Sequence, residues 1–330
     1  MSIEFRTFDE LEPKLLAAAY DAAFAPRTRT AAAWSHARGD GAVARLEGIA
    51  ALQEGRVIAA YASCSMRGTC QANTTRLGQV VDSFVTPEVR GTLGAARLLV
   101  QCGERHFARH GGADTTAFHY GWPIETVRPL GEAHLGYVPL RREVVLYSEL
   151  SGSESCPGEV QVGGDVEERL STGQAAHDEL WERLAHERAI AVSHDAAWLR
   201  WRVREHPHTS YERLVVRHAD GRLAGAVVLA ASDAWHPRTI AIADWLVPET
   251  ESSAAALLVA AARARAAAAG AKVLLALVPT RSAAFDVLQQ LQLKPHDSGR
   301  YLCVRSFDPR VGERDLRAGL WTTMLDSDLV

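Results

Sequence analysis

The sequence is poor in lysine, and it lacks long runs of like charge or of apolar residues. Only three lysines occur among its 36 basic residues, which we attribute to coding bias. The net charge is −4 and no basic tract is present, which argues against a general nucleic-acid surface. No segment approaches the roughly 18–20 apolar residues that span a membrane. The alanine-rich run 254–269 is interrupted by Arg263 and Arg265, so it predicts a helix in a soluble domain.

The cysteines form no recognisable pairing or metal pattern. Their number is odd and no CxxC spacing occurs, so we expect reduced thiols and a cytoplasmic protein. The first residues, Met-Ser-Ile-Glu-Phe-Arg, are acidic and lack the apolar core of a signal peptide. The 13 histidines form no ligand cluster, so we expect no metal. No Ser-His-Asp order with a nucleophile elbow occurs, which argues against a hydrolase. The five cysteines are Cys64, Cys70, Cys102, Cys156 and Cys303.

The chain is long enough for about two domains. It has 330 residues, of which 47% are hydrophobic and 23% charged, as in a globular protein. The segment 151–164 is rich in Ser, Gly and Pro and predicts a linker. We therefore expect domains at 1–150 and 165–330.

Strands and helices alternate in both halves of the chain. In the first half, strands are expected at 3–7, 49–53, 57–66, 76–85, 115–120 and 142–150, and helices at 12–24, 95–109 and 124–135. In the second half, strands are expected at 211–218, 223–231, 238–247, 272–278 and 301–307, and helices at 174–187, 196–205, 252–269 and 281–293. The halves align on Asp82-x-x-Val85 and Asp244-x-x-Val247, which indicates tandem domains.

The most informative stretch of the sequence is 82–99. A strand ends near Pro87, a turn carries Arg90, Gly91 and Gly94, and an amphipathic helix begins near Ala95. Free N–H groups and the helix dipole at such a terminus favour an anion such as pyrophosphate. The local chemistry therefore suits a phosphate-bearing cofactor.

This stretch resembles the coenzyme A loop of the GCN5-related N-acetyltransferases, Val-x-Pro-x-x-Arg-Gly-x-Gly-x-Gly/Ala. The element order β-α-β-β-β-α-β-α-β of residues 1–150 is similar to that family as well. The loop departs from the pattern at Leu93, where the middle glycine is usual, and Gly94 stands where an apolar residue is usual. The resemblance implies an α/β (α+β) fold of two tandem domains, each with a mixed, mostly antiparallel sheet flanked by helices. It also implies acetyl-CoA or another acyl-CoA as cosubstrate, held by Ser83, Phe84, Val85, Arg90, Gly91, Thr92, Leu93, Gly94 and Ala95.

The matching turn of the second half is unlike the first. It reads Pro248-Glu-Thr-Glu-Ser-Ser253, with two acids and neither Arg nor Gly, and it is three residues shorter. Acids at this place repel a pyrophosphate. We therefore expect the coenzyme in the first domain, and a degenerate second domain that is structural or shapes the acceptor pocket.

Two residues are candidates for proton transfer. Asp82 stands at an acidic position frequent in the family and suits a general base, although a hydrogen bond to a neighbouring loop explains it equally well. The tyrosine that often serves as general acid in the family is replaced by Glu132. Tyr120 is the candidate substitute, with His119 beside it. Packing of Tyr120 as a capping aromatic, or protonation of the thiolate by water, are the alternatives.

A helix in the second half carries Trp198 and Arg202 one turn apart. They predict an acceptor-binding face, while core or domain-interface packing is the stronger alternative. With Pro207, Tyr211 and the ending Trp321–Asp328, this segment is similar to tandem acetyltransferases of polysaccharide or natural-product pathways. That likeness implies a tail over the cleft of the first domain.

These features favour an acyl-CoA-dependent N-acyltransferase that acts by direct transfer in a ternary complex. The expected partner is a small-molecule amine, such as an amino sugar, an amino acid or a natural-product amine, with neither nucleic acid nor membrane. One alternative is an aminoacyl-tRNA-dependent transferase of the tandem type, which the acidic composition disfavours. The other is a non-catalytic protein of this fold that binds a ligand or partner. The oligomeric state is open.

Overall fold

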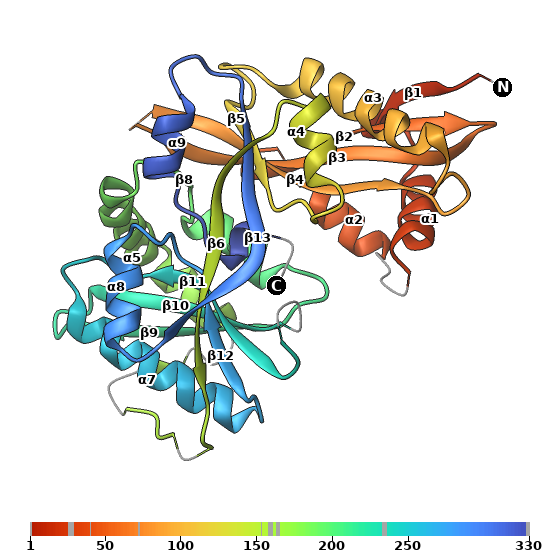
Figure 1. Ribbon diagram of the computed structural model, residues 1–330. Helices are drawn as coiled ribbons and strands as arrows, with labels where there is room; N and C mark the ends of the chain where they lie inside the picture. Colours follow the sequence, from red (N-terminus) through yellow and green to blue (C-terminus); the bar gives the residue numbers. More distant parts are fainter. Residues whose placement is uncertain are drawn as a thin grey trace. The chain divides into compact units, whose positions relative to one another are not determined.

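Two strands, β6 (Val138–Glu149) and β13 (Lys294–Ser306), each contribute residues to both of the units into which the chain divides. The computed structural model describes residues 2–25, 30–39, 41–71, 73–152, 154–157, 161–162, 166–232 and 236–327 (Figure 1). The predicted linker 151–164 lies partly outside these residues, as does Asp328 at the end of the predicted tail. The chain divides into two units, which comprise Met1–Gly68, Thr74–Arg141 and Arg300–Leu316 in the first, and Thr69–Asn73, Arg142–Gly299 and Arg317–Val330 in the second.

The first unit is a mixed, mostly antiparallel sheet covered by helices on both faces. Its strand order is β1-β2-β3-β4-β5-β13. The strands are β1 (Glu4–Thr7), β2 (Ala44–Gln53), β3 (Arg56–Cys70), β4 (Asn73–Val85), β5 (Phe118–Gly121) and part of β13 (Lys294–Ser306). The helices are η1 (Phe8–Glu10), α1 (Pro13–Phe24), α2 (Ala31–Arg38), α3 (Leu93–His110), α4 (Arg128–His134) and α9 (Glu313–Gly319), the last of which ends in the second unit.

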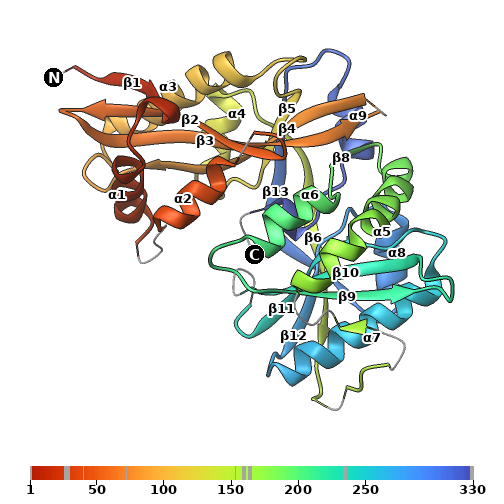
Figure 2. The same ribbon diagram turned by 180° about the vertical axis from the view of Figure 1, so that it is seen from behind.

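The two faces of this sheet are covered by different helices. One apolar cluster joins α1 and α2 to alternate residues of β2 and β3, and another joins α3 and α4 to the residues between them. Figures 1 and 2 show α1 with α2 and α3 with α4 on opposite faces. Strands buried on both sides have nearly continuous apolar sequences, and β2 and β3 show that pattern. Glu54 and Gly55 join them with φ of 52° and 75°, which confirms the predicted hairpin.

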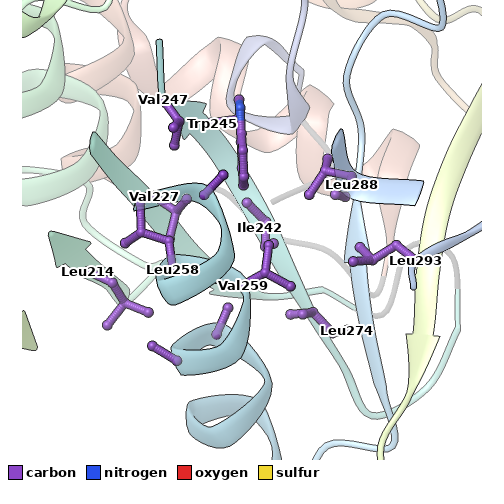
Figure 3. Packing of buried hydrophobic residues seen from close by; sticks show 14 of the residues in the cluster. Leu214, Val227, Ile242, Trp245, Val247, Leu258, Val259, Leu274, Leu288 and Leu293 are labelled. Carbon is purple, nitrogen blue, oxygen red and sulfur yellow. The ribbon is translucent and has the colours of Figure 1, made fainter. Parts of the chain in front are cut away.

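The second unit repeats this arrangement. Its strand order is β6-β12-β11-β10-β9-β7. The strands are β6 (Val138–Glu149), β7 (Gln161–Val162), β8 (Ile190–Val192), β9 (Tyr211–Arg217), β10 (Leu223–Ala231), β11 (Thr239–Leu246) and β12 (Val273–Ala276). The helices are α5 (Val166–Glu187), α6 (Ala196–Leu199), η2 (Arg200–Arg204), α7 (Ser252–Ala268), α8 (Ala283–Gln290) and η3 (Met324–Asp326). Figure 3 shows the apolar core, in which Leu258 and Val259 of α7 pack on Val227 and Ile242 of the sheet.

The units differ from the predicted ranges 1–150 and 165–330 by an exchange of segments. Residues 142–149 of β6 belong to the second unit, where Leu146–Glu149 pair antiparallel with β12. Residues 300–316 belong to the first unit, where Cys303–Ser306 pair antiparallel with β5. Each half therefore contributes its last strand to the other unit, which a reading of consecutive segments cannot reveal.

Several predicted elements have different bounds in the structure. The helix expected at 124–135 begins only at Arg128, because Pro129 suits the first turn of a helix and does not interrupt it. The helix expected at 196–205 changes from α to π geometry at Arg200. The strand expected at 301–307 is β13, which begins seven residues earlier, at Lys294. In the part of the chain that the structure describes, no helix is long and apolar enough to cross a membrane.

Candidate active site

The candidate site lies where β4 and β5 of the first unit separate. The two strands are parallel and pair over three positions, from Leu77 opposite Phe118 to Gln79 opposite Tyr120. Strand β4 then continues to Val85, while β5 ends at Gly121. Among the described residues, no strand continues this ladder beyond Gln79. The end of β4, residues 83–85, therefore extends past its paired register with β5 and suits an extended ligand laid beside it as an added strand.

The turn after β4 leads to a helix whose N-terminus has no side-chain cap. Thr92 is the N-cap residue of α3, but its hydroxyl donates to the carbonyl of Val89 at 2.8 Å and caps nothing. Gly91 has φ of 83° and open space around it, so the turn is both left-handed and unobstructed. Since no side chain caps this terminus, the N–H groups of Leu93 and Gly94 suit an anion. The helix begins at Leu93, two residues before the predicted start.

Arg90 lies in this turn, and its side chain holds the turn in place. Its Nη2 donates to the carbonyl of Ala23 at 2.8 Å and to that of Val85 at 3.1 Å. The guanidinium thus ties the end of α1 to the end of β4. Its charge adds to the positive end of the helix dipole beside the turn.

Asp82 occupies an irregular position in β4. It is 8% exposed and has φ of 50°, a left-handed conformation that aspartate tolerates better than most residues. The neighbouring residues alternate in direction, since Phe84 packs with α1 and Val85 with α3. Strand irregularities of this kind often re-aim a side chain next to a functional site.

Tyr120 and His119 are buried in β5. Tyr120 is 1% exposed, and its ring lies 5.9 Å from that of Trp122 and 6.3 Å from that of Phe118. Burial lowers the pKa of His119 to about 3, so this imidazole is neutral. Tyr120 is thus a packed aromatic in this structure, and its role as general acid stays a prediction.

The sequence did not reveal a polar layer beneath the site. The hydroxyl of Ser63 and Nε2 of His106 are 3.0 Å apart, and the Tyr61 and Tyr137 hydroxyls share a hydrogen bond. Burial raises the pKa of Tyr61 and lowers that of His106. All of these side chains are neutral and internal, so they shape the core behind β4. Isolated His, Ser and Tyr positions carry no spacing signal by which they could have been grouped.

The matching position in the second unit is chemically different. Asp244 is fully buried, and its Oδ2 lies 2.9 Å from Nδ1 of His194, whose Nε2 lies 3.0 Å from Oδ1 of Asp326. Oδ1 of Asp244 accepts hydrogen bonds from the Trp245 N–H and from the Thr323 hydroxyl. Burial alone would raise the pKa of Asp244, but the charge of His194 outweighs it and the pKa lies below its usual value. Asp244 is therefore a poor proton acceptor.

The predicted acceptor face on α6 and η2 is internal. Trp198 is 1% exposed and stacks on His194 with ring centroids 3.7 Å apart. Arg202 donates to the carbonyls of Leu325 at 3.2 Å and Ser327 at 2.9 Å, and to the Tyr211 hydroxyl at 2.8 Å. This arrangement matches the packing alternative. The tail expected over the cleft of the first domain packs inside the second unit, where residues 322–327 are buried.

No group of His, Cys, Asp or Glu within the described ranges is placed to hold a metal ion.

The similarity of this chain to known proteins is one of structure. No protein-family model matches the sequence, and no curated protein matches it. Solved structures match over most of the chain.

A conserved protein of Enterococcus faecalis, described as a probable N-acyltransferase, has a TM-score of 0.65 at 12% identity over 93% of this chain and 73% of its own. A tandem GCN5-related N-acetyltransferase of the clavulanic acid biosynthesis pathway has a TM-score of 0.57 at 15% identity, over 93% of this chain and 99% of its own. The N-myristoyltransferase of Saccharomyces cerevisiae with bound myristoyl-CoA has a TM-score of 0.57 at 10% identity, over 93% of this chain and 83% of its own.

These likenesses define an α/β protein with the acyltransferase architecture in two copies. The chain has the tandem fold of the GCN5-related N-acetyltransferases, as the sequence of residues 82–99 and the element order implied. At these identities the likeness extends to the fold, and chemistry has to be argued from the residues.

Proposed function

We propose that the protein is an acyl-CoA-dependent N-acyltransferase, with acetyl-CoA as donor and a small-molecule amine as acceptor. The observation that supports this most is that β4 runs past its pairing with β5 and leads, through the Gly91 turn, to the N-terminus of α3, which no side chain caps. Neighbours of the same fold include a protein crystallised with myristoyl-CoA, which supports an acyl-CoA donor.

The residues of the first unit fit such a cosubstrate. The N–H groups at Leu93 and Gly94, in the first turn of α3, suit the pyrophosphate, and Arg90 adds positive charge. The peptide groups of Ser83–Val85 suit the amide-bearing arm as a neighbouring strand would. When bound, the coenzyme supplies an activated acyl thioester.

The chain itself supplies proton acceptance and exclusion of water. Asp82 is the candidate that takes the proton of the acceptor ammonium, directly or through a water molecule. Asp82 follows the last paired residue of the β4–β5 register, Gln79, and it is shielded from bulk solvent. Tyr120 stays the candidate for returning a proton to the leaving thiolate, with water as the alternative.

Calorimetry with acetyl-CoA tests the proposal. We expect one site, weakened strongly by Arg90→Glu and little by Arg263→Glu. Arg263 is a matched control because its guanidinium, on α7, also donates to a backbone carbonyl, that of Leu291. Melting curves of both variants separate loss of binding from loss of folding.

Two results would overturn the assignment. Absence of binding at high micromolar acetyl-CoA would favour a non-catalytic protein of this fold. Equal weakening by the two variants would remove the coenzyme from the β4–α3 turn. Binding of aminoacyl-tRNA would support the other donor, although the net charge of −4 argues against it.

A further inference from the structure

A pocket lies in the second unit, at the end of β11 and beside the N-termini of α7 and α8. Its inner surface is apolar and aromatic, and its mouth is acidic. Its cavity volume is about 30 Å³, room for roughly two waters or a group the size of a carboxylate. Figure 3 shows Trp245 and Val247, which form part of its inner wall, at this end of the core. The lining residues that carry the argument are Glu187, Arg188, Trp245, Glu249, Glu251 and Trp321.

Arg188 brings a buried positive charge to this pocket. It is 2% exposed, and its Nη2 donates to the carbonyl of Trp245 at 2.5 Å. Its guanidinium carbon lies 4.0 Å from the centre of the Trp321 ring. Burial lowers its pKa to about 10, so the group is charged at neutral pH.

Two donor atoms beside the pocket lack acceptors. Among the described residues, neither Nη1 of Arg188 nor Nε1 of Trp321 has a hydrogen-bond partner, although both atoms are buried. Leaving such donors unpaired is costly, the more so when one carries charge. Their common position on one pocket indicates an acceptor with at least one anionic oxygen.

The mouth of the pocket excludes a simple anion. Glu187, Glu249 and Glu251 line it, and the Glu187 carboxylate accepts the N–H of Glu249. Burial and the charge of Glu249 raise the pKa of Glu187. A positive charge nearby would therefore stabilise the Glu187 carboxylate. Glu251 is already paired with His218 and Arg183. The ligand that fits both ends carries a carboxylate and an ammonium group.

We propose that this pocket binds a small amino acid, with its carboxylate on Arg188 and Trp321 and its ammonium group between Glu187 and Glu249. Because the two donor nitrogens are shielded from solvent, the Trp321 ring moves aside when the ligand enters. Glu249, one of the two acids that repel a pyrophosphate in the Pro248–Ser253 turn, attracts the ammonium group together with Glu187. The second unit thus keeps a ligand site of different chemistry at the place that corresponds to the coenzyme turn of the first.

Titration of the full-length protein with glycine and L-alanine, followed by calorimetry and tryptophan fluorescence, tests the proposal. Propionate, which lacks the ammonium group, and ethylamine, which lacks the carboxylate, are the matched ligands. We expect binding of the amino acids only, with a fluorescence change. Arg188→Met is expected to weaken it by ~10- to 100-fold, since a charge-assisted hydrogen bond is lost. Glu249→Gln should also weaken it.

The variants are chosen so that a folding defect does not decide the result. Trp321→Phe keeps an aromatic ring beside Arg188 and removes the five-membered ring that carries the N–H, and Arg263→Met is the control for an arginine outside the pocket. We expect Trp321→Phe to weaken binding and Arg263→Met to leave it unchanged. Lack of binding of either amino acid to the wild type at millimolar concentration overturns the proposal. Equal affinity of Trp321→Phe and wild type overturns it as well, as does equal binding of propionate.

Discussion

Two aspartates at matching places in the tandem units show how neighbours decide the chemistry of a residue. Asp244 of β11 is 0% exposed, and both its oxygens accept hydrogen bonds from His194, Trp245 and Thr323. Asp82 of β4 is 8% exposed and follows the point at which β4 leaves its partner β5. A carboxylate held at low pKa by a buried cation accepts protons poorly. The base of the proposed reaction therefore has to be sought in the first unit.

Replacing Asp82 by asparagine keeps its shape and removes its basicity. We expect kcat to fall by about 10²- to 10⁴-fold, the usual contribution of a general base, with the Kd for acetyl-CoA unchanged. Steady-state kinetics and calorimetry measure the two quantities. Asp286→Asn on the exposed face of α8 serves as the control. Normal turnover of Asp82→Asn at neutral pH would exclude Asp82 as the base.

His194 predicts how stability depends on pH. Both of its ring nitrogens face carboxylates, those of Asp244 and Asp326, so the imidazole has to carry two protons. Burial opposes this charge, but the two aspartates outweigh burial and raise the pKa to about 9. Because the pKa of His194 is higher in the folded than in the unfolded protein, its protonation stabilises the fold. This stabilisation is complete below the unfolded-state pKa of about 6.5 and is lost as the pH rises through 9.

The unfolding free energy is therefore expected to fall between pH 6.5 and 9, by on the order of 3 kcal/mol from this group. Asp326→Asn removes one of the two negative charges, so it should lower the His194 pKa and flatten the fall across this window. Denaturant titrations at several pH values measure both proteins. An unchanged slope in Asp326→Asn would show that the charge of Asp326 does not control His194. Burial lowers the pKa values of three other histidines, His106, His119 and His177. Their protonation in the unfolded chain destabilises the fold below pH 6.5, so they do not affect the range between pH 6.5 and 9.

At the scale of elements, local sequence predicted most of the strands and helices. β3, β4, α3 and α7 lie within a few residues of their expected ranges: β3 is a continuous apolar run, β4 and α3 have apolar residues at strand or helix spacing, and α7 is rich in alanine. The expected range 49–53 covered only the second half of β2. Helix α2 was missed, since its short sequence AAAWSHAR carries a single large apolar residue, Trp34. The start of β13 was missed because Lys294–Asp297 is exposed and polar, so no alternation marks it.

The same limit applies within the candidate site. The turn with Gly91 and the start of α3 were predicted from local chemistry, which depends only on neighbouring residues. The bond from Arg90 to Ala23 joins residues 67 positions apart, and no local pattern contains it. Likewise, the irregular backbone of Asp82 and the His194 network depend on packing between distant segments. Sequence spacing predicts which element carries a residue, and long-range packing decides what the residue does.

Gly78 of β4 lies opposite His119 of β5, at the middle of the three paired positions before the two strands separate. A Cβ at this position would lie 2.3 Å from Cδ2 of the buried His119 ring. We expect Gly78→Ala to destabilise the protein by about 1–3 kcal/mol through overpacking. Denaturant melts measure the change. The double variant Gly78→Ala, His119→Ala should show a smaller loss than the sum of the two single variants, whereas additive losses would show that the ring relaxes freely.

At the scale of the whole molecule, the exchange of strands couples the two halves of the chain. Residues 300–316 complete the first unit, although they follow nearly all of the second. Within that unit, Phe307 packs on Phe107 with ring centroids 5.4 Å apart, and its N–H donates to the carbonyl of Ala117. Arg305 donates to the carbonyl of Leu135 at 2.9 Å and covers the Phe107 ring. The first unit therefore cannot be completed from the first half of the chain.

This coupling predicts the behaviour of fragments. A fragment of residues 1–150 leaves the edge of β5 without β13 and exposes Phe107, so we expect aggregation or the absence of a cooperative thermal transition. A fragment in which residues 1–141 are joined through a flexible Gly-Ser linker to residues 300–316 keeps every strand of the first unit and should melt cooperatively. Calorimetry and circular dichroism distinguish the two. The linked fragment should also bind acetyl-CoA, because the β4–α3 turn lies entirely within it. A cooperative transition of the 1–150 fragment would show that the exchanged segment is dispensable, and the boundary at residue 150 would then stand as a true domain limit.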